Sequence, residues 1–213
     1  MTTIFLARHG LTAQTGKILY GRTPGVSLDD RGRAQAEGFV ERFDGVRLAA
    51  IYSSPMERCV ETVAPLAAHR GLTVINSGGL IEMDTGDWTN RSLAQVRRTK
   101  LWREVLDTPS QFRFPGGEGF AEAQARAIGE VARIAGRHPR GAVLVSTHGD
   151  IVRMLVAHFA GAHLDLFQRT IVDTAGISVV TLDGGSARVL LVNDAGGGLR
   201  RFARPGRKAN LRG

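Results

Sequence analysis

A chain of 213 residues, 43% of them hydrophobic, can bury one substantial core, and its sequence contains no seam that would divide it into two domains. Its single cysteine, Cys59, excludes an intrachain disulfide and a cysteine-built zinc site, and we expect it to be a buried apolar side chain. We find no apolar run long enough to span a bilayer and no signal-peptide pattern after Met1. We therefore expect a cytoplasmic protein without membrane contact.

The formal charge of +8 is concentrated near the end of the chain. From Gly196 onward there are six basic residues and no acidic one, and subtracting these six from +8 leaves +2 for the rest. A Gly- and Arg-rich terminus with few apolar residues favours disorder. We predict one domain over residues 1–195 and a basic, flexible tail over 196–213. Weak contact of this tail with polyanions is the minority interpretation, and we expect no other nucleic-acid binding.

Apolar stretches rich in β-branched residues alternate with helical patterns along the chain. We predict strands at residues 3–7, 50–52, 72–75, 142–146, 177–182 and 189–192. The predicted helices begin near Leu28, after Pro55, at about Glu118 and after Gly149. Several strands are too uniformly apolar to have a solvated face, which is typical of a sheet covered on both sides. The pattern predicts an α/β fold, a three-layer α/β/α sandwich with a central, mostly parallel sheet.

Residues 85–117 interrupt this alternation. The segment is polar, contains Trp88 and Trp102, and has short helical stretches only around residues 93–105. We predict that it is an insertion over one face of the sheet, above the active site. Excursions of this kind often shape an active site.

Residues that could hold a phosphate follow two of the predicted strands. The first strand ends in Arg8-His9-Gly10, and the strand at 142–146 is followed by His148-Gly149. Side chains at the carboxyl ends of strands in an open α/β sheet project into the crevice where ligands bind, and glycine allows close approach. One Arg-His-Gly could arise by chance. A second His-Gly at a second strand end is much less easily accidental.

Arg58 and Glu82 add a second guanidinium and a carboxylate. Arg58 lies in the first turn of the helix after Pro55, where the helix N-terminus itself attracts anions. Glu82 follows the edge of the third predicted strand. Each residue also has a plainer interpretation, a solvated helix face for Arg58 and an ion pair with one of the arginines for Glu82.

Together these side chains are the types that phosphoryl transfer through a histidine requires. A neutral imidazole nitrogen attacks phosphorus in line, and two guanidiniums and a second histidine neutralise the charge on the phosphoryl oxygens. A carboxylic acid protonates the leaving alkoxide. Because fixed cations take the place of Mg²⁺, we expect neither a metal nor another cofactor.

The order and spacing of the motifs resemble the histidine phosphatase superfamily, also called the phosphoglycerate-mutase-like family. The matching stretches lie at residues 6–10, 27–36, 52–59, 80–88, 114–118 and 145–149. The resemblance covers nearly the whole body of the chain. Residues 21–25 and 102–118 are, in addition, similar to an actinobacterial branch labelled as probable phosphomutases.

The resemblance implies a role for each residue of the proposed site. It implies that His9 is the phosphorylated nucleophile and that Glu82 is the proton donor. It also implies that Arg8, Arg58 and His148 form the phosphate pocket.

The loop after the nucleophile departs from the family pattern. Family members usually place an Asn six residues after the nucleophile, whereas the loop at residues 11–16 is one residue short and contains Gln14 and Thr15. We expect one of these two to replace the Asn. We also expect Gly21, Arg22 and Gly149 to contact the substrate.

Three functions stay open on the sequence alone. A phosphatase and a mutase both form phosphohistidine, and they differ in whether water or a retained phosphorylated product attacks next. The family's glycolytic mutases are longer and have a tail that closes the site, which favours a phosphatase here, whereas the branch label favours a mutase. A phosphate-binding or interaction module without turnover is the third possibility, although every expected site residue is present.

We expect the partner to be a small phosphorylated metabolite, and the protein to be a monomer or homodimer.

Overall fold

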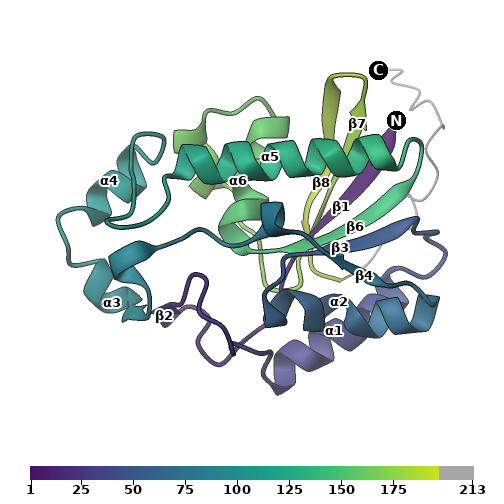
Figure 1. The fold of residues 1–213 in the computed structure, drawn as a ribbon, viewed down its shortest axis with the longest axis horizontal. Coiled ribbons are helices and arrows are strands. Elements are labelled where there is room, and N and C mark those ends of the chain that lie inside the picture. The colour runs from purple at the N-terminus through teal and green to yellow at the C-terminus, as the bar shows by residue number, and fades with distance from the viewer. Residues whose placement is uncertain (197–213) are drawn as a thin grey trace.

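The computed structural model describes residues 1–196, and its centre is one six-stranded sheet (Figure 1). The strands lie in the order β4-β3-β6-β1-β7-β8. Their bounds are Val74–Asn76 for β4, Ala50–Ser53 for β3, Ala142–Thr147 for β6, Thr2–Arg8 for β1, Ile177–Asp183 for β7 and Ser186–Asp194 for β8. The first four in this order run parallel, whereas β7 and β8 are antiparallel to their neighbours. The sheet is therefore mostly parallel, as the sequence predicts.

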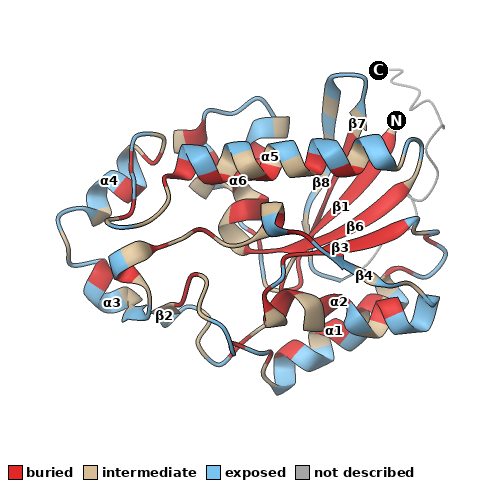
Figure 2. Ribbon diagram, viewed as in Figure 1, coloured by how far each residue is buried: buried red, intermediate tan, exposed pale blue. Residues whose placement is uncertain are grey.

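Helices cover both faces of this sheet. The first pair, α1 (Asp30–Arg42) and α2 (Glu57–Arg70), lies on one face, and α5 (Phe120–Arg137) and α6 (Gly149–Phe159) lie on the other (Figure 1). Strand β1 contributes to both cores, because Ile4 and Leu6 pack with α5 and α6 while Phe5 and Ala7 pack with α1 and α2. The central strands are accordingly buried along their length (Figure 2). The predicted α/β/α sandwich is confirmed.

Local sequence signals set the ends of several elements. Asp29 caps α1, because its side chain accepts a hydrogen bond from the Gly32 N–H at 2.8 Å. The turn between β7 and β8 has positive φ at both Gly184 and Gly185, the backbone that a tight hairpin requires. Pairing therefore resumes at Ser186, and β8 is longer than the predicted strand.

Residues 85–117 leave the sheet and fold as short elements. These are η2 (Gly86–Trp88), β5 (Arg91–Ser92), α3 (Leu93–Val96) and α4 (Trp102–Asp107). Strand β5 pairs with β2 (Ile18–Leu19) in a small second sheet. Trp88 packs against other aromatic side chains of the same segment. Its ring centroid lies between 5.5 and 6.4 Å from those of Trp102, Phe112 and Phe114. The proposed bounds of the insertion stay a prediction.

The remaining described helices are the short η1 (Gly78–Leu80) and η3 (Leu164–Arg169). Cys59 is fully buried, as expected for an apolar side chain. No helix within residues 1–196 is long and apolar enough to cross a membrane. Apart from Gly196, the predicted basic tail lies outside the described residues, so its flexibility and its polyanion contacts stay predictions.

Candidate active site

The residues that follow β1 and β6 border a cavity of about 260 Å³. Arg8 and His9 line it from the end of β1, Gly149 lines it from the start of α6, and Glu82 lines it from the loop after η1. Residues 15–21 and the 85–117 segment also contribute lining residues. The carboxyl ends of the parallel strands thus bring together residues far apart in the sequence.

His9 is held as a neutral imidazole with one nitrogen free. Its backbone N–H donates to the Thr147 carbonyl at 2.9 Å, and its side-chain Nδ1 lies 2.7 Å from the Gly10 carbonyl oxygen. A carbonyl only accepts, so Nδ1 carries the hydrogen and Nε2 keeps its lone pair. Burial, followed by the positive charge of Arg58, lowers the pKa of His9 to about 3. The imidazole is therefore uncharged at neutral pH.

Arg58 and His148 lie completely buried beside His9 and do not themselves line the cavity. The rings of His9 and His148 are 5.5 Å apart between centroids. Arg58 Nη2 donates to the Gly21 carbonyl at 2.8 Å and lies 3.2 Å from His148 Nδ1. The guanidinium also lies over the Tyr20 ring, 4.7 Å from its centroid. These contacts hold the Arg58 guanidinium in place.

The charge of His148 differs from the sequence-based expectation. Its Nδ1 accepts from Arg58, so its Nε2 carries the hydrogen and donates to Ser54 Oγ at 2.8 Å. Burial and then the charge of Arg58 hold the pKa of His148 well below its usual value. His148 is therefore neutral in this structure, and the positive charge of the site comes from Arg8 and Arg58.

Several buried guanidinium nitrogens have no hydrogen-bond partner in the described part of the chain. These are Arg8 Nε together with Nε and Nη1 of Arg58, whereas Arg8 Nη1 donates to the Val172 carbonyl at 2.7 Å. A buried donor left unsatisfied costs about 1–3 kcal/mol, more for a charged group. Unpaired cationic donors of this kind are suited to an oxyanion. Gly149 leaves room for Arg8, because a Cβ at that position would lie 3.1 Å from Arg8 Nε.

Glu82 is a half-buried carboxyl with an unusual proton affinity. Its Oε1 accepts from the Met83 N–H at 2.9 Å, and its Oε2 lies 3.6 Å from His148 Nδ1. Burial raises the pKa of Glu82 to about 7, and the nearby carboxylate of Asp150 contributes to the rise. A large fraction of the carboxyl is consequently protonated near neutral pH.

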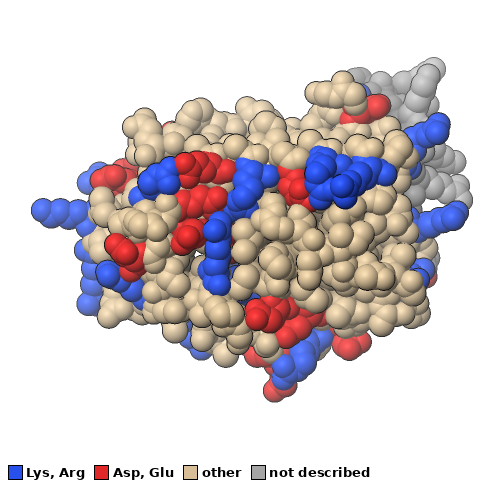
Figure 3. All heavy atoms as spheres, in the orientation of Figure 1, with Lys and Arg blue, Asp and Glu red and all other residues tan. Residues whose placement is uncertain are grey.

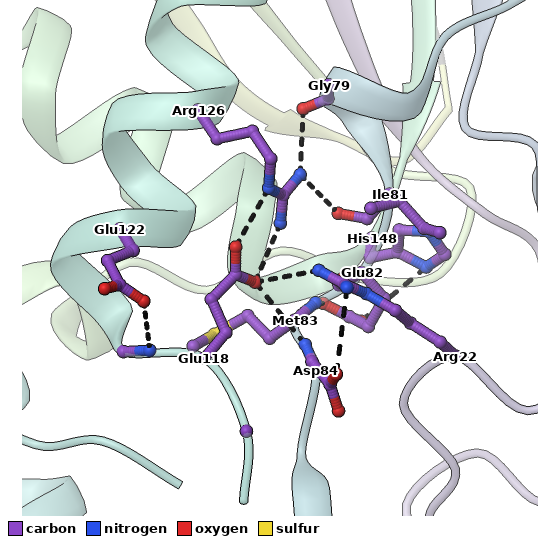
Figure 4. Close-up of polar contacts among 12 residues, drawn as sticks. Arg22, Gly79, Ile81, Glu82, Met83, Asp84, Glu118, Glu122, Arg126 and His148 are labelled. Atoms are coloured by element: carbon purple, nitrogen blue, oxygen red, sulfur yellow. Dashed lines mark hydrogen bonds and ion pairs between the residues drawn. The ribbon is translucent and has the colours of Figure 1, made fainter.

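An ion-pair network holds the loop that carries Glu82 (Figure 4). Arg126 on α5 donates from Nη1 to the carbonyls of Gly79 and Ile81, at 2.9 and 3.0 Å. Its Nε and Nη2 bind the two carboxylate oxygens of Glu118, each at 3.0 Å. Arg126 was not predicted as a site residue, because one arginine on an amphipathic helix looks like part of a solvated face. Glu118 was predicted only as the end of the 114–118 motif and the approximate start of a helix.

Arg22 joins the same network (Figure 4). Its Nε donates to the Glu82 carbonyl at 2.8 Å and its Nη2 donates to Glu118 Oε2 at 3.0 Å. Arg22 was expected to contact the substrate, but it is not among the residues that line the cavity. Its guanidinium instead binds the backbone carbonyl of Glu82.

The loop after His9 has one of its two expected residues at the cavity. Thr15 lines the cavity, and its hydroxyl lies 2.9 Å from that of Thr12. Gln14 is not among the lining residues. Its carbonyl accepts the N–H groups of Lys17 and Ile18 in a turn. Gly21 lines the cavity and, as noted, binds Arg58 through its carbonyl.

The described residues provide neither an activated thiol nor a cluster of metal ligands. Burial raises the pKa of Cys59 to about 12, so its thiol is not an activated nucleophile. No group of three or more His, Cys, Asp or Glu side chains within residues 1–196 is arranged to hold a metal ion.

The chain matches the model of a known protein family over most of its length. The family model described as the histidine phosphatase superfamily (branch 1) matches residues 4–195. The chain belongs to the histidine phosphatase superfamily. Among curated relatives of this histidine phosphatase, phosphoserine phosphatase 1 of Hydrogenobacter thermophilus is 28% identical over 198 residues, covering 91% of this chain and 92% of that protein. The bifunctional protein Rv2228c of Mycobacterium tuberculosis is 31% identical over 202 residues, covering 92% of this chain but 54% of that protein.

Solved structures share the fold of this histidine phosphatase. Bacillus stearothermophilus YhfR matches with a TM-score of 0.85 and 27% identity, covering 93% of this chain and 98% of that one. Mycobacterial glucosyl-3-phosphoglycerate phosphatase Rv2419c matches with a TM-score of 0.80 and 22% identity, covering 90% of this chain and 98% of that one. The second likeness shows the fold alone.

Proposed function

We propose that this histidine phosphatase hydrolyses small phosphomonoesters through a phosphohistidine formed on His9. Membership of the superfamily and the phosphatase names of its relatives support the reaction class. One observation carries the assignment of residues. A neutral imidazole with a free Nε2 lies beside buried, unpaired N–H groups of Arg8 and Arg58.

In the first half-reaction the Nε2 lone pair of His9 attacks phosphorus in line. The N–P bond forms as the bond from phosphorus to the leaving oxygen breaks. Glu82 gives its proton to that oxygen, so the product leaves as a neutral alcohol. A pKa near 7 suits this role, because a general acid works best when its pKa lies near the working pH.

In the second half-reaction a water molecule attacks the phosphohistidine. Glu82, now a carboxylate, takes a proton from the water, and the N–P bond breaks to release inorganic phosphate. His9 and protonated Glu82 are thereby restored. The hydrogen bond from His9 Nδ1 to the Gly10 carbonyl supports the imidazole while it carries the phosphoryl group, because it stabilises the positive charge on the ring.

The proposal assigns the phosphoryl oxygens to the arginines. Arg8 Nε and the free N–H groups of Arg58 are fixed before substrate arrives, so they stabilise the transferring group with little reorganisation. His148 stays a member of the phosphate pocket in this proposal, as the neutral acceptor that holds Arg58 in place. Since both cations are covalent parts of the chain, we propose that turnover needs no metal ion.

Phosphate release from a panel of phosphomonoesters, with and without chelator, tests this function. We expect equal amounts of phosphate and alcohol, activity that survives chelation, and a loss of at least about 10³-fold in His9→Ala, since each ~1.4 kcal/mol of barrier is tenfold in rate. His69→Ala is the matched control, because His69 is an exposed histidine on α2. Activity of more than a few per cent in His9→Ala, or activity that requires added Mg²⁺, would refute the proposal.

A further inference from the structure

We propose that the preferred substrates are phosphate esters of apolar alcohols bearing a single ring or a short branched chain, rather than phosphates of sugars or glycerol. The inference rests on the function proposed above and concerns the same cavity. The evidence for it is the set of other side chains that form the walls of this cavity, besides His9, Arg8 and Glu82.

These walls are mainly apolar and aromatic. Leu93 and Trp102 of the 85–117 segment line the cavity, as do Phe114 near its end and Phe120 at the start of α5. Met83 lines it next to Glu82. A leaving group attached to a phosphate on His9 would extend between these side chains, because they share one cavity with His9.

The apolar wall is formed before any ligand binds. Ring contacts hold it, since the Trp88 centroid lies 6.4 Å from that of Trp102 and 5.5 Å from that of Phe114. The rings of Phe114 and Phe120 are 5.6 Å apart. Trp102 is only half-buried, so part of its surface remains available to a ligand. An apolar ligand therefore binds a preformed surface and does not have to order it.

Several polar side chains of the wall already have hydrogen-bond partners, and one exception among the described residues is the buried Nε of Arg153. The hydroxyls of Thr85 and Thr89 are 2.8 Å apart, and Arg153 Nη1 donates to Asp150 Oδ1 at 3.1 Å. The Thr15 hydroxyl is likewise bonded to Thr12. A polyhydroxylated leaving group would lose several hydrogen bonds to water and would gain fewer from these side chains.

The size of the cavity narrows the class further. At about 260 Å³ it lies just below the ~300–1,000 Å³ typical of small-molecule sites. Phosphate with one ring or a short branched chain is compatible with this volume.

A series of primary alkyl phosphates tests the inference without changing the chemistry of the leaving oxygen. The probes are phenethyl, isoamyl, ethyl and glycerol phosphate, which all leave as primary alcohols. We expect kcat/KM for phenethyl phosphate to exceed that for glycerol phosphate by at least about 100-fold, since one methylene in an apolar pocket is worth ~10- to 200-fold. Isoamyl phosphate should fall between phenethyl and ethyl phosphate.

A matched pair of variants connects the selectivity to the wall. Leu93→Ala shortens a side chain that lines the cavity, whereas Leu106→Ala shortens an exposed leucine on α4 outside it. We expect Leu93→Ala to reduce the phenethyl-to-ethyl ratio of kcat/KM about tenfold. Leu106→Ala should leave that ratio unchanged.

The outcomes separate this inference from the function on which it rests. Glycerol phosphate turned over as well as phenethyl phosphate, or equal ratios in the two leucine variants, would overturn the inference while His9-dependent hydrolysis still stood. Failure of the wild-type enzyme to release phosphate from any ester, or full activity in His9→Ala, would overturn both.

Discussion

Burial shifts the pKa values of His9 and Glu82 in opposite directions. We assign nucleophilic attack to His9 and proton transfer to Glu82. Burial lowers the pKa of His9 to about 3 and raises that of Glu82 to about 7. Exclusion of water disfavours the charged form of each group, which is the cation for imidazole and the anion for a carboxyl. The same enclosed site therefore provides both a free nucleophile and a proton donor at neutral pH.

A Glu82→Gln variant should separate leaving groups by their basicity. An alkyl ester needs a proton as its alkoxide departs, whereas nitrophenolate leaves without help, so the alkyl ester should lose about 10²- to 10⁴-fold and the nitrophenyl ester much less in the phosphorylation step. Single-turnover release of alcohol or phenol measures that step. Equal losses for both esters would mean that Glu82 only positions neighbouring groups.

Asp150→Asn should shift the alkaline limb of the kcat profile. The negative charge of Asp150 raises the pKa of Glu82, so removing it lowers that pKa, and the protonated acid is lost at a lower pH. In the wild type the limb should fall near pH 7 for an alkyl ester. Asp107→Asn removes the same charge from an exposed site on α4 and should leave the limb in place. An unmoved limb in Asp150→Asn would contradict this coupling.

Residues at strand ends could be located from the sequence, whereas the contacts of some loop residues could not. His9 and His148 could be placed because each directly follows an apolar strand, and parallel strands end at the same edge of a sheet. Gln14 and Arg22 lie in the loops before and after β2, and the position of Arg22 depends on a distant contact, its hydrogen bond to the Glu82 carbonyl. No local pattern encodes such a contact.

At the scale of elements, the same division holds. The buried strands β1, β3 and β6 read as uninterrupted apolar runs, and their bounds differ from the predicted ones by one residue at most. The pairing of β2 with β5 was not predicted. Each of these strands has only two residues, and α1, β3, α2 and β4 lie between them along the chain. Periodicity cannot reveal so short a pair.

The network between α5 and the Glu82 loop should matter for both stability and chemistry. In Glu118→Gln, Arg126 and Arg22 lose their shared carboxylate, and hydrogen bonds to charged groups are worth about 1.5–3 kcal/mol. We expect a free energy of unfolding lower by about 2 kcal/mol and a loss of kcat that is larger for alkyl than for nitrophenyl esters, because Glu82 loses its fixed position.

The control for this network is Glu104→Gln, which makes the same change on the exposed surface of α4. It should alter neither the unfolding free energy nor the ratio of the two esters. A Glu118→Gln enzyme that loses stability but keeps the wild-type ratio would show that the network supports the fold without positioning Glu82.

At the scale of the whole molecule, charge is mixed over the described surface. Basic and acidic side chains are interspersed on the face drawn in Figure 3. This agrees with the small net charge predicted for the body of the chain, once the basic tail is set aside. Long-range attraction of polyanions to this face is therefore not an expected property.

Acid should destabilise the fold through its buried histidines. His9 and His148 stay neutral when folded but take up protons below about pH 6.5 when unfolded, so their contribution to stability is lost as pH falls. Glu82 acts in the opposite sense, because its raised pKa favours the folded state below about pH 7. Two histidines outweigh one carboxyl, and we expect unfolding free energy to be about 2 kcal/mol lower at about pH 5 than at about pH 7.5.

Urea unfolding of His9→Asn checks this linkage. The variant lacks one of the two buried histidines and should lose little stability over the same pH range. His69→Asn removes an exposed histidine and should behave as the wild type does. Equal acid sensitivity in all three proteins would contradict the pKa assigned to His9.

Covalent trapping of the phosphoryl group tests the proposed mechanism most directly. Glu82→Gln mixed with nitrophenyl phosphate should still form phosphohistidine, because nitrophenolate leaves unaided, but should hydrolyse it slowly for lack of a base. Denaturation at alkaline pH, which preserves phosphohistidine, followed by peptide mass spectrometry should place the phosphoryl group on His9. The His9→Ala, Glu82→Gln double variant should carry none. Release of phosphate with no labelled His9, or a label on any other residue, would contradict the mechanism.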